Sequence, residues 1–160
     1  MSDRAQVIAQ MRQTPSTLRD LLTDATDAAL DFRPTTHAWT NREILAHLVD
    51  DEMFVMRTRL ERIVKEERPD LAPHDEQKWY AGRNTARDAL PTLLGDFETQ
   101  RAASLGIFAL LRESEWSRVG FQPEYGVFTA ADWLDRWLEH DQTHLEQVAS
   151  NLTLFRERQG

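Results

Sequence analysis

The sequence contains no cysteine, which excludes disulfide bonds, thiolate metal ligands and cysteine nucleophiles. Any metal ion would therefore be held by histidine and carboxylate side chains, and any thiol chemistry would need a thiol from a second substrate. Glycine and proline are also scarce, with six of each in 160 residues, and β-branched residues never gather into alternating runs. This composition predicts a mainly helical protein.

Long apolar runs are missing too. No stretch approaches the ~20 apolar residues that a membrane helix needs, and residues 1–12 lack the apolar segment of a signal peptide. We therefore expect a cytoplasmic protein that makes no use of a membrane. The net charge is −8, and the basic residues between positions 57 and 65 alternate with glutamates, as on a solvated helix face. Nucleic acid is not an expected partner.

Apolar residues recur at three- and four-residue spacings in four segments, which predict an all-α four-helix bundle formed by one domain over residues 1–160. The segments cover about 3–30, 40–69, 85–111 and 129–155. Pro15 should kink or break the first of them. The polar residues 70–83 would form a long crossover between the second and third helices. Residues 120–126, with two glycines and a proline, are expected to form a loop.

Helix start signals support three of these segments. Thr40 and Glu43 have the spacing of a capping box, in which each side chain binds a free backbone N–H at the start of a helix. Residues 129–132, from Thr129 to Asp132, repeat this kind of signal before the last segment. Pro91 suits a first helical turn, so the third helix has two candidate starts, Thr85 and Pro91.

Three of the five histidines form a pattern on these helices. His140 and His144 are four residues apart, so both rings project from one face, one turn apart. They lie at the edge of the apolar stripe of the last helix, beside two tryptophans. His47 occupies the same kind of position in the second helix. Bundles commonly bind metals through side chains on facing helices, so His47, His140 and His144 are predicted to bind one divalent ion.

Each part of this pattern has a simpler interpretation. A His-x-x-x-His pair also occurs on helix surfaces, and a lone histidine such as His47 is often a core residue bonded to a backbone carbonyl. The metal hypothesis depends on the two helices presenting their imidazoles together. His37 and His74 lie in the connections beside Pro34 and Pro73, and we interpret both as ordinary loop histidines.

Several other residues could support such a site. Asp51, one turn after His47, or its neighbour Glu52 could orient His47 or act as a base, although both also suit a helix surface. Asp141 falls on the apolar stripe of the last helix, so it should pair with an arginine or a backbone donor. Three arginines are candidates for that partner: Arg42, Arg101 and Arg136. Three aromatic residues could wall a pocket over the metal: Trp39, Tyr125 and Trp133.

With these residues identified, the chain resembles the DinB/YfiT-like family of metalloenzymes. The resemblance covers most of the length, and its specific parts are residues 39–48, residues 126–129 and the motif at 139–147, from Glu139 to Gln147. It implies an up-down-down-up bundle with the long crossover between helices two and three. It also implies a three-histidine metal site, which falls on His47, His140 and His144, and a homodimer.

Three nitrogen ligands would leave an open position on the ion, which is the arrangement of a catalytic rather than a structural site. Zinc or nickel is favoured, with iron or manganese also compatible. We expect a metal-dependent hydrolase or a thiol-dependent transferase acting on a small molecule. The second activity is implied by relatives that use low-molecular-weight thiols. The alternative is a non-catalytic bundle that holds a metal and binds a ligand or a protein partner.

Overall fold

The computed structural model describes residues 3–160, and four long helical rods dominate it. The rods are α1 (Arg4–Leu22), then α3 (Asn41–Asp51) running through the π-helical segment η1 (Glu52–Met56) into α4 (Arg57–Lys65), then α6 (Leu90–Leu110) and α7 (Ala130–Gln159). The shorter elements are α2 (Asp27–Leu30), α5 (Glu76–Gly82), the 3₁₀ turns η2 (Thr85–Arg87) and η3 (Glu113–Glu115), and the strands β1 (Val119–Gln122) and β2 (Gly126–Thr129). The predicted four-helix bundle is confirmed.

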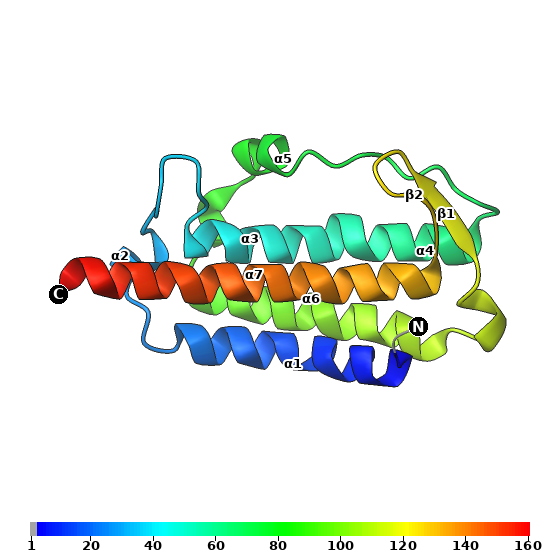
Figure 1. Cartoon of the computed structure of the whole chain (residues 1–160), viewed down its shortest axis with the longest axis horizontal. Helices are drawn as coiled ribbons and strands as arrows, with labels where there is room; N and C mark the ends of the chain where they lie inside the picture. The colour runs from blue at the N-terminus through cyan, green and yellow to red at the C-terminus, as the bar shows by residue number, and fades with distance from the viewer. Residues whose placement is uncertain (1–2) are drawn as a thin grey trace.

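The rods are connected in the up-down-down-up order (Figure 1). α1 and α7 run in one direction, whereas the α3–α4 rod and α6 run in the other. Because α3–α4 and α6 are parallel, the chain must return along the bundle between them, and residues 66–89 make this crossover. α5 is the helical part of the crossover, and it lies above α3 in the same view.

The helix start signals act as the sequence predicts. Thr40 caps α3, where its Oγ1 accepts from the backbone N–H of Glu43 at 3.2 Å and the Glu43 carboxylate accepts from the N–H of Thr40 at 2.8 Å. Thr129 and Asp132 form the same reciprocal pair at the start of α7. α6 begins at Leu90 with Pro91 in its first turn, which confirms the later of the two predicted starts.

Of the kink or break expected at Pro15, the break does not occur, because α1 continues through Pro15 to Leu22 and the chain turns only afterwards, before α2. A proline inside a helix leaves the carbonyl four residues earlier without its N–H partner. That carbonyl belongs to Met11, and it accepts a hydrogen bond of 2.9 Å from Nη1 of Arg101 on α6. A neighbouring helix therefore supplies the bond that Pro15 removes.

The expected loop at 120–126 is instead the centre of an antiparallel hairpin formed by β1 and β2. Gly126 has φ +73, a conformation that glycine adopts without strain, and it begins β2 directly after the turn. The crossover pairs with this hairpin, since the N–H of Leu71 donates to the Phe121 carbonyl at 2.7 Å and the N–H of Phe121 donates to the Pro69 carbonyl at 2.9 Å. The hairpin and the crossover thus cover one side of the bundle together (Figure 1).

The apolar core consists of two clusters of buried side chains. One contains Met11, Leu60, Trp133 and Trp137 among others, and the second contains Leu18, Leu45, Phe97 and Val148 among others. Buried polar residues, including His47, Arg101 and Asp141, complete the interior. Within residues 3–160, none of the helices has the length and apolar character needed to span a membrane.

Candidate metal centre

Three imidazole nitrogens meet where α3 packs against α7. The Nε2 atom of His47 lies 3.1 Å from Nε2 of His140 and 3.0 Å from Nε2 of His144, and the latter two are 3.2 Å apart. The one-turn spacing on α7 aligns His140 with His144, as the sequence predicts. His47 comes from the second turn of the capped helix α3, so the Thr40 cap fixes the position from which this ring projects.

The tautomer of His144 is fixed by its neighbour Gln147. The Oε1 atom of Gln147 lies 2.8 Å from Nδ1 of His144. An amide oxygen only accepts hydrogen bonds, so Nδ1 must carry the hydrogen and Nε2 keeps its lone pair. Ligating histidines typically have such a partner on the far nitrogen. Sequence analysis assigned no role to Gln147, although its place three residues after His144 on a helix indicated the contact.

Burial keeps the three imidazoles neutral. It lowers the pKa of His47 to about 3, with smaller effects from His144 and His74. Burial also lowers the pKa of His144 and holds the pKa of His140 well below its ordinary value. Neutral imidazole is the form that binds metal ions, so all three rings are in the required protonation state at neutral pH.

The triad cannot satisfy its own hydrogen bonds. In a neutral ring, each Nε2 carries either a hydrogen or a lone pair, so three mutual contacts must include at least one pair of like atoms. A shared cation removes this conflict, because every nitrogen then directs a lone pair at it. The spacing also suits an ion, because nitrogens 3.0–3.2 Å apart can all lie about 2.1 Å from a common point. The three residues therefore fit a divalent metal ion.

A carboxyl group and a fourth histidine lie beside the triad. Asp51 is buried, with Oδ1 3.2 Å from Nε2 of His74 and Oδ2 3.6 Å from Nε2 of His140. Burial, followed by repulsion from Glu76, raises the pKa of Asp51 to about 8. The interpretation of His74 as an ordinary loop residue is thus wrong, because the crossover carries it over Asp51. His37 is exposed, as expected for a loop residue.

Asp51 was one of two carboxylates considered for orienting His47 or acting as a base, but it lies 3.5 Å from the nearest His47 nitrogen and forms no hydrogen bond with it. Glu52 faces another way and does not reach the triad. Its two carboxylate oxygens each accept from Arg101 at 2.9 Å, so the predicted role of Glu52 beside His47 is wrong.

Arg101 is the centre of a second buried polar group, which we call the Arg101 cluster: Arg101, Glu52, Asp141, Thr14 and the indole of Trp137. Arg101 donates to both oxygens of Asp141, at 2.5 and 2.8 Å, and Oγ1 of Thr14 donates to Asp141 at 2.8 Å. Nε1 of Trp137 donates to Glu52 at 2.9 Å. Of the three arginines considered for Asp141, Arg101 is the partner.

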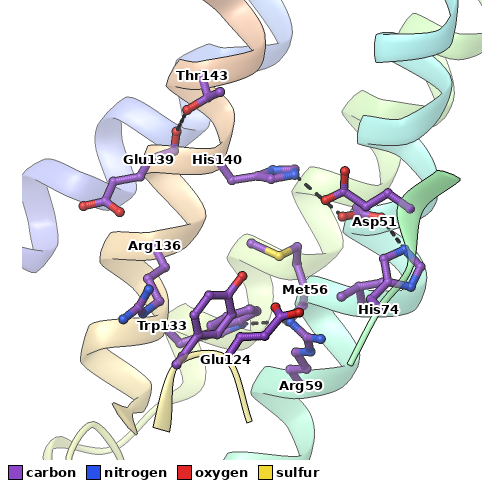
Figure 2. A pocket seen from close by; sticks show the side chains of 13 residues that line it. Asp51, Met56, Arg59, His74, Glu124, Trp133, Arg136, Glu139, His140 and Thr143 are labelled. Atoms are coloured by element: carbon purple, nitrogen blue, oxygen red, sulfur yellow. Dashed lines mark hydrogen bonds and ion pairs between the residues drawn. The ribbon is translucent and has the colours of Figure 1, made fainter. Parts of the chain in front are cut away.

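A cavity of about 230 Å³ opens beside the triad. Its wall includes His140, Asp51 and His74 from the site, and Tyr125 and Trp133, two of the three aromatic residues singled out in the sequence. Figure 2 shows His140 and Asp51 at one end of this cavity and Trp133 and Arg59 at the other. Trp39, the third aromatic residue, instead packs edge-on against His47, with ring centres 4.8 Å apart.

Comparisons with known proteins agree with this fold. Two relatives carry the name "putative metal-dependent hydrolase": one from Oceanobacillus iheyensis is 24% identical over 89% of this chain and 82% of its own length, and one from Bacillus licheniformis is 27% identical over 90% and 82%. The solved structure of YfiT from Bacillus subtilis superposes with a TM-score of 0.83 at 21% identity, covering 94% of this chain and 87% of YfiT. Its title calls YfiT a "probable metal-dependent hydrolase with an unusual four-helix bundle topology". The DinB superfamily model matches residues 10–148, and the chain belongs to this family.

Proposed function

We propose that His47, His140 and His144 bind one divalent metal ion and that the protein is a metal-dependent hydrolase of a small molecule. The observation that carries the proposal is the convergence of three neutral Nε2 atoms to within 3.0–3.2 Å of one another. Such an ion would supply Lewis-acid chemistry, polarising a carbonyl or phosphoryl oxygen and lowering the pKa of water. Zinc or nickel is the favoured ion.

The protein's own residues supply the rest of the site. Gln147 holds His144 in the tautomer that leaves Nε2 free. Asp51 faces His140 from the cavity side, and His74 lies beside Asp51, so a carboxyl group and an imidazole border the position of the proposed ion. The aromatic rings of Trp133 and Tyr125 line the same cavity and give it an apolar part.

Metal binding is tested first, by elemental analysis of untagged wild-type protein beside His144→Ala. His37→Ala is the matched control, because it removes an exposed histidine outside the triad. We expect near-stoichiometric metal in the wild type and the control, and none in folded His144→Ala. Metal-free wild-type protein whose melting temperature does not rise with added zinc or nickel would refute the site.

Hydrolysis is tested separately, with metal-loaded protein and panels of esters, amides and phosphoesters. Turnover that disappears in His144→Ala and persists in His37→Ala would support the hydrolase. Consumption of an electrophile only when a low-molecular-weight thiol is present would instead support the thiol-dependent transferase. A fully loaded protein that turns over nothing in either assay would contradict the hydrolase and favour the non-catalytic bundle. A homodimer stays a prediction, which light scattering can test.

A further inference from the structure

Two arginines are buried in this protein, and their surroundings differ. Arg101, 1% exposed, is neutralised by Glu52 and Asp141. Arg59 on α4 is 9% exposed, and among residues 3–160 it forms no ion pair with a carboxylate. Its one hydrogen bond is from Nη2 to the carbonyl of Ala72, at 2.8 Å. The carboxylates of Asp51 and Glu124 act on Arg59 only from beyond ion-pair distance. A buried cation without a directly paired carboxylate is costly, so Arg59 lacks a close partner that its position calls for.

A second incompletely paired arginine lies on α7, one turn before His140. The guanidinium of Arg136 stacks 4.5 Å from the ring centre of Tyr125, at the hairpin turn. Its Nε atom is buried and has no hydrogen-bond partner among residues 3–160. Like Arg59, Arg136 forms no ion pair in this described part of the chain. Both guanidinium groups therefore keep donors available for an acceptor that the protein does not provide.

Both arginines line the cavity that also reaches His140. In Figure 2, Arg59 and Arg136 enter from opposite sides, from α4 and α7, with Trp133 and Glu124 between them. Arg59 also lies over the face of Trp133, 5.4 Å from the ring centre, which holds its guanidinium plane in place. Planar guanidinium groups with fixed orientation are suited to carboxylate and phosphate oxygens.

The rest of the wall limits what can bind. Four carboxyl groups also line the cavity, those of Asp51, Glu76, Glu124 and Glu139, and none of them pairs with Arg59 or Arg136. They disfavour an anion beside them, and an anion between the two guanidinium groups would have to displace the carboxylate of Glu124, an exposed residue of the hairpin turn. At about 230 Å³ the cavity accepts a molecule of a few non-hydrogen atoms, rather than a polymer segment.

We propose that Arg59 and Arg136 form an anion subsite that binds the carboxylate or phosphate of a small substrate while the rest of that substrate extends toward His140. This inference rests on the proposed function, because it assigns the substrate class of the same site. The subsite would act by binding and orienting the substrate, so its residues contribute to affinity in the ground state as well as to turnover.

The test is calorimetric titration of zinc-loaded protein with three probes: succinate, inorganic phosphate and the neutral succinamide. The variants are Arg59→Gln and Arg136→Gln, with Arg12→Gln as the matched control, because Arg12 is an exposed arginine of α1 outside this cavity. We expect at least one anion to bind, succinamide to bind about tenfold more weakly or worse, and each cavity variant to lose about tenfold in anion affinity. Arg12→Gln should match the wild type. Whichever of succinate and phosphate binds more tightly identifies the anionic group.

Anion affinity that is unchanged in both cavity variants would overturn the proposal, as would the absence of anion binding to the wild type. Circular dichroism establishes that each variant is folded, and Arg136→Gln, which replaces a less buried residue, decides the matter if Arg59→Gln does not fold.

His144→Ala separates this inference from the proposed function. Anion binding kept in His144→Ala but lost in the arginine variants supports the subsite even if the protein holds no metal. Anion binding lost in His144→Ala and kept in the arginine variants would show that the anion binds at the triad, which contradicts the subsite.

Discussion

The Arg101 cluster draws on all four rods, and on two of them its residues are direct neighbours of residues at the histidine triad. On the α3–α4 rod, Asp51 faces the triad whereas Glu52 faces Arg101. On α7, His140 belongs to the triad and Asp141 to the cluster. In the cluster, Arg101 has two carboxylate partners and a carbonyl, so its polar atoms are satisfied within the protein. In the triad, three Nε2 atoms meet, and at least one pair of them cannot form a hydrogen bond. We infer that the Arg101 cluster, whose polar atoms all have partners within the protein, is structural. The triad, whose nitrogens do not, is the binding site.

The largest expected effect is on the Arg101 cluster. Arg101→Met leaves two buried carboxylates without a cation and the Met11 carbonyl without a donor. We expect a loss of about 3–5 kcal/mol in the free energy of unfolding, measured by urea denaturation. The exposed Arg12→Met is the control. Adding Glu52→Gln and Asp141→Asn to Arg101→Met should recover part of the loss, and a single variant as stable as the wild type would contradict the structural role.

The triad should contribute stability only when metal is bound. With free zinc at about 100 times its dissociation constant, the wild type should gain about 2.7 kcal/mol, which for a chain of this size corresponds to a melting temperature about 5–10 °C higher. His144→Ala should lose this gain while its metal-free stability stays close to that of the wild type, because the substitution relieves a contact between like atoms. A large loss of metal-free stability in His144→Ala would show that the triad is a structural group.

Gln147 should raise the affinity for the metal ion by holding the His144 ring in the tautomer that binds it. Gln147→Ala removes the acceptor at Nδ1 and frees the ring to change tautomer. We expect metal affinity to fall about 10–100-fold, measured by competition with a chromophoric chelator. Gln142→Ala, another exposed glutamine of α7, is the control. Equal affinities for the two variants would show that Gln147 does not orient the ligand.

The smallest expected effect is on the hydrogen bond between Thr14 and Asp141, the outermost contact of the Arg101 cluster. Thr14→Val removes the hydroxyl that donates to Asp141 at 2.8 Å while keeping the shape of the side chain. We expect a loss of about 1.5 kcal/mol in the free energy of unfolding with metal stoichiometry unchanged. Thr17→Val, whose hydroxyl bonds only to a carbonyl of its own helix, should change stability by less. A drop in metal content on Thr14→Val would show that cluster and triad are coupled.

The sequence correctly predicted those features that depend on residues within a few positions of one another, namely helix starts and the histidine pair on α7. Thr40, Pro91 and Thr129 start helices because the groups that cap them lie within three residues. The pairing of His140 with His144 follows from helical geometry in the same way. His47 could be added because the edge of its apolar stripe indicates the side facing the bundle.

The features that were predicted wrongly depend on contacts between segments that are distant in the sequence. His74 reaches Asp51 only because of the path of the crossover, which no local pattern specifies. Glu52 turns from the triad to Arg101, 49 residues further along the chain. Pro15 is tolerated because the same arginine binds the Met11 carbonyl. The hairpin at 119–129 was missed because its strands are four residues each and pair with the crossover.

The crossover helix α5 has a consequence for how this protein can evolve. None of its residues is buried, and it is held mainly at its far end, where Trp79 and Arg83 bind Asp50. The segment before that attachment contributes His74 and Glu76 to the cavity wall. Substitutions of His74 and Glu76 therefore change this part of the cavity wall without altering the packing of the four rods. The lining of the cavity can vary at these two positions in evolution while the bundle stays intact.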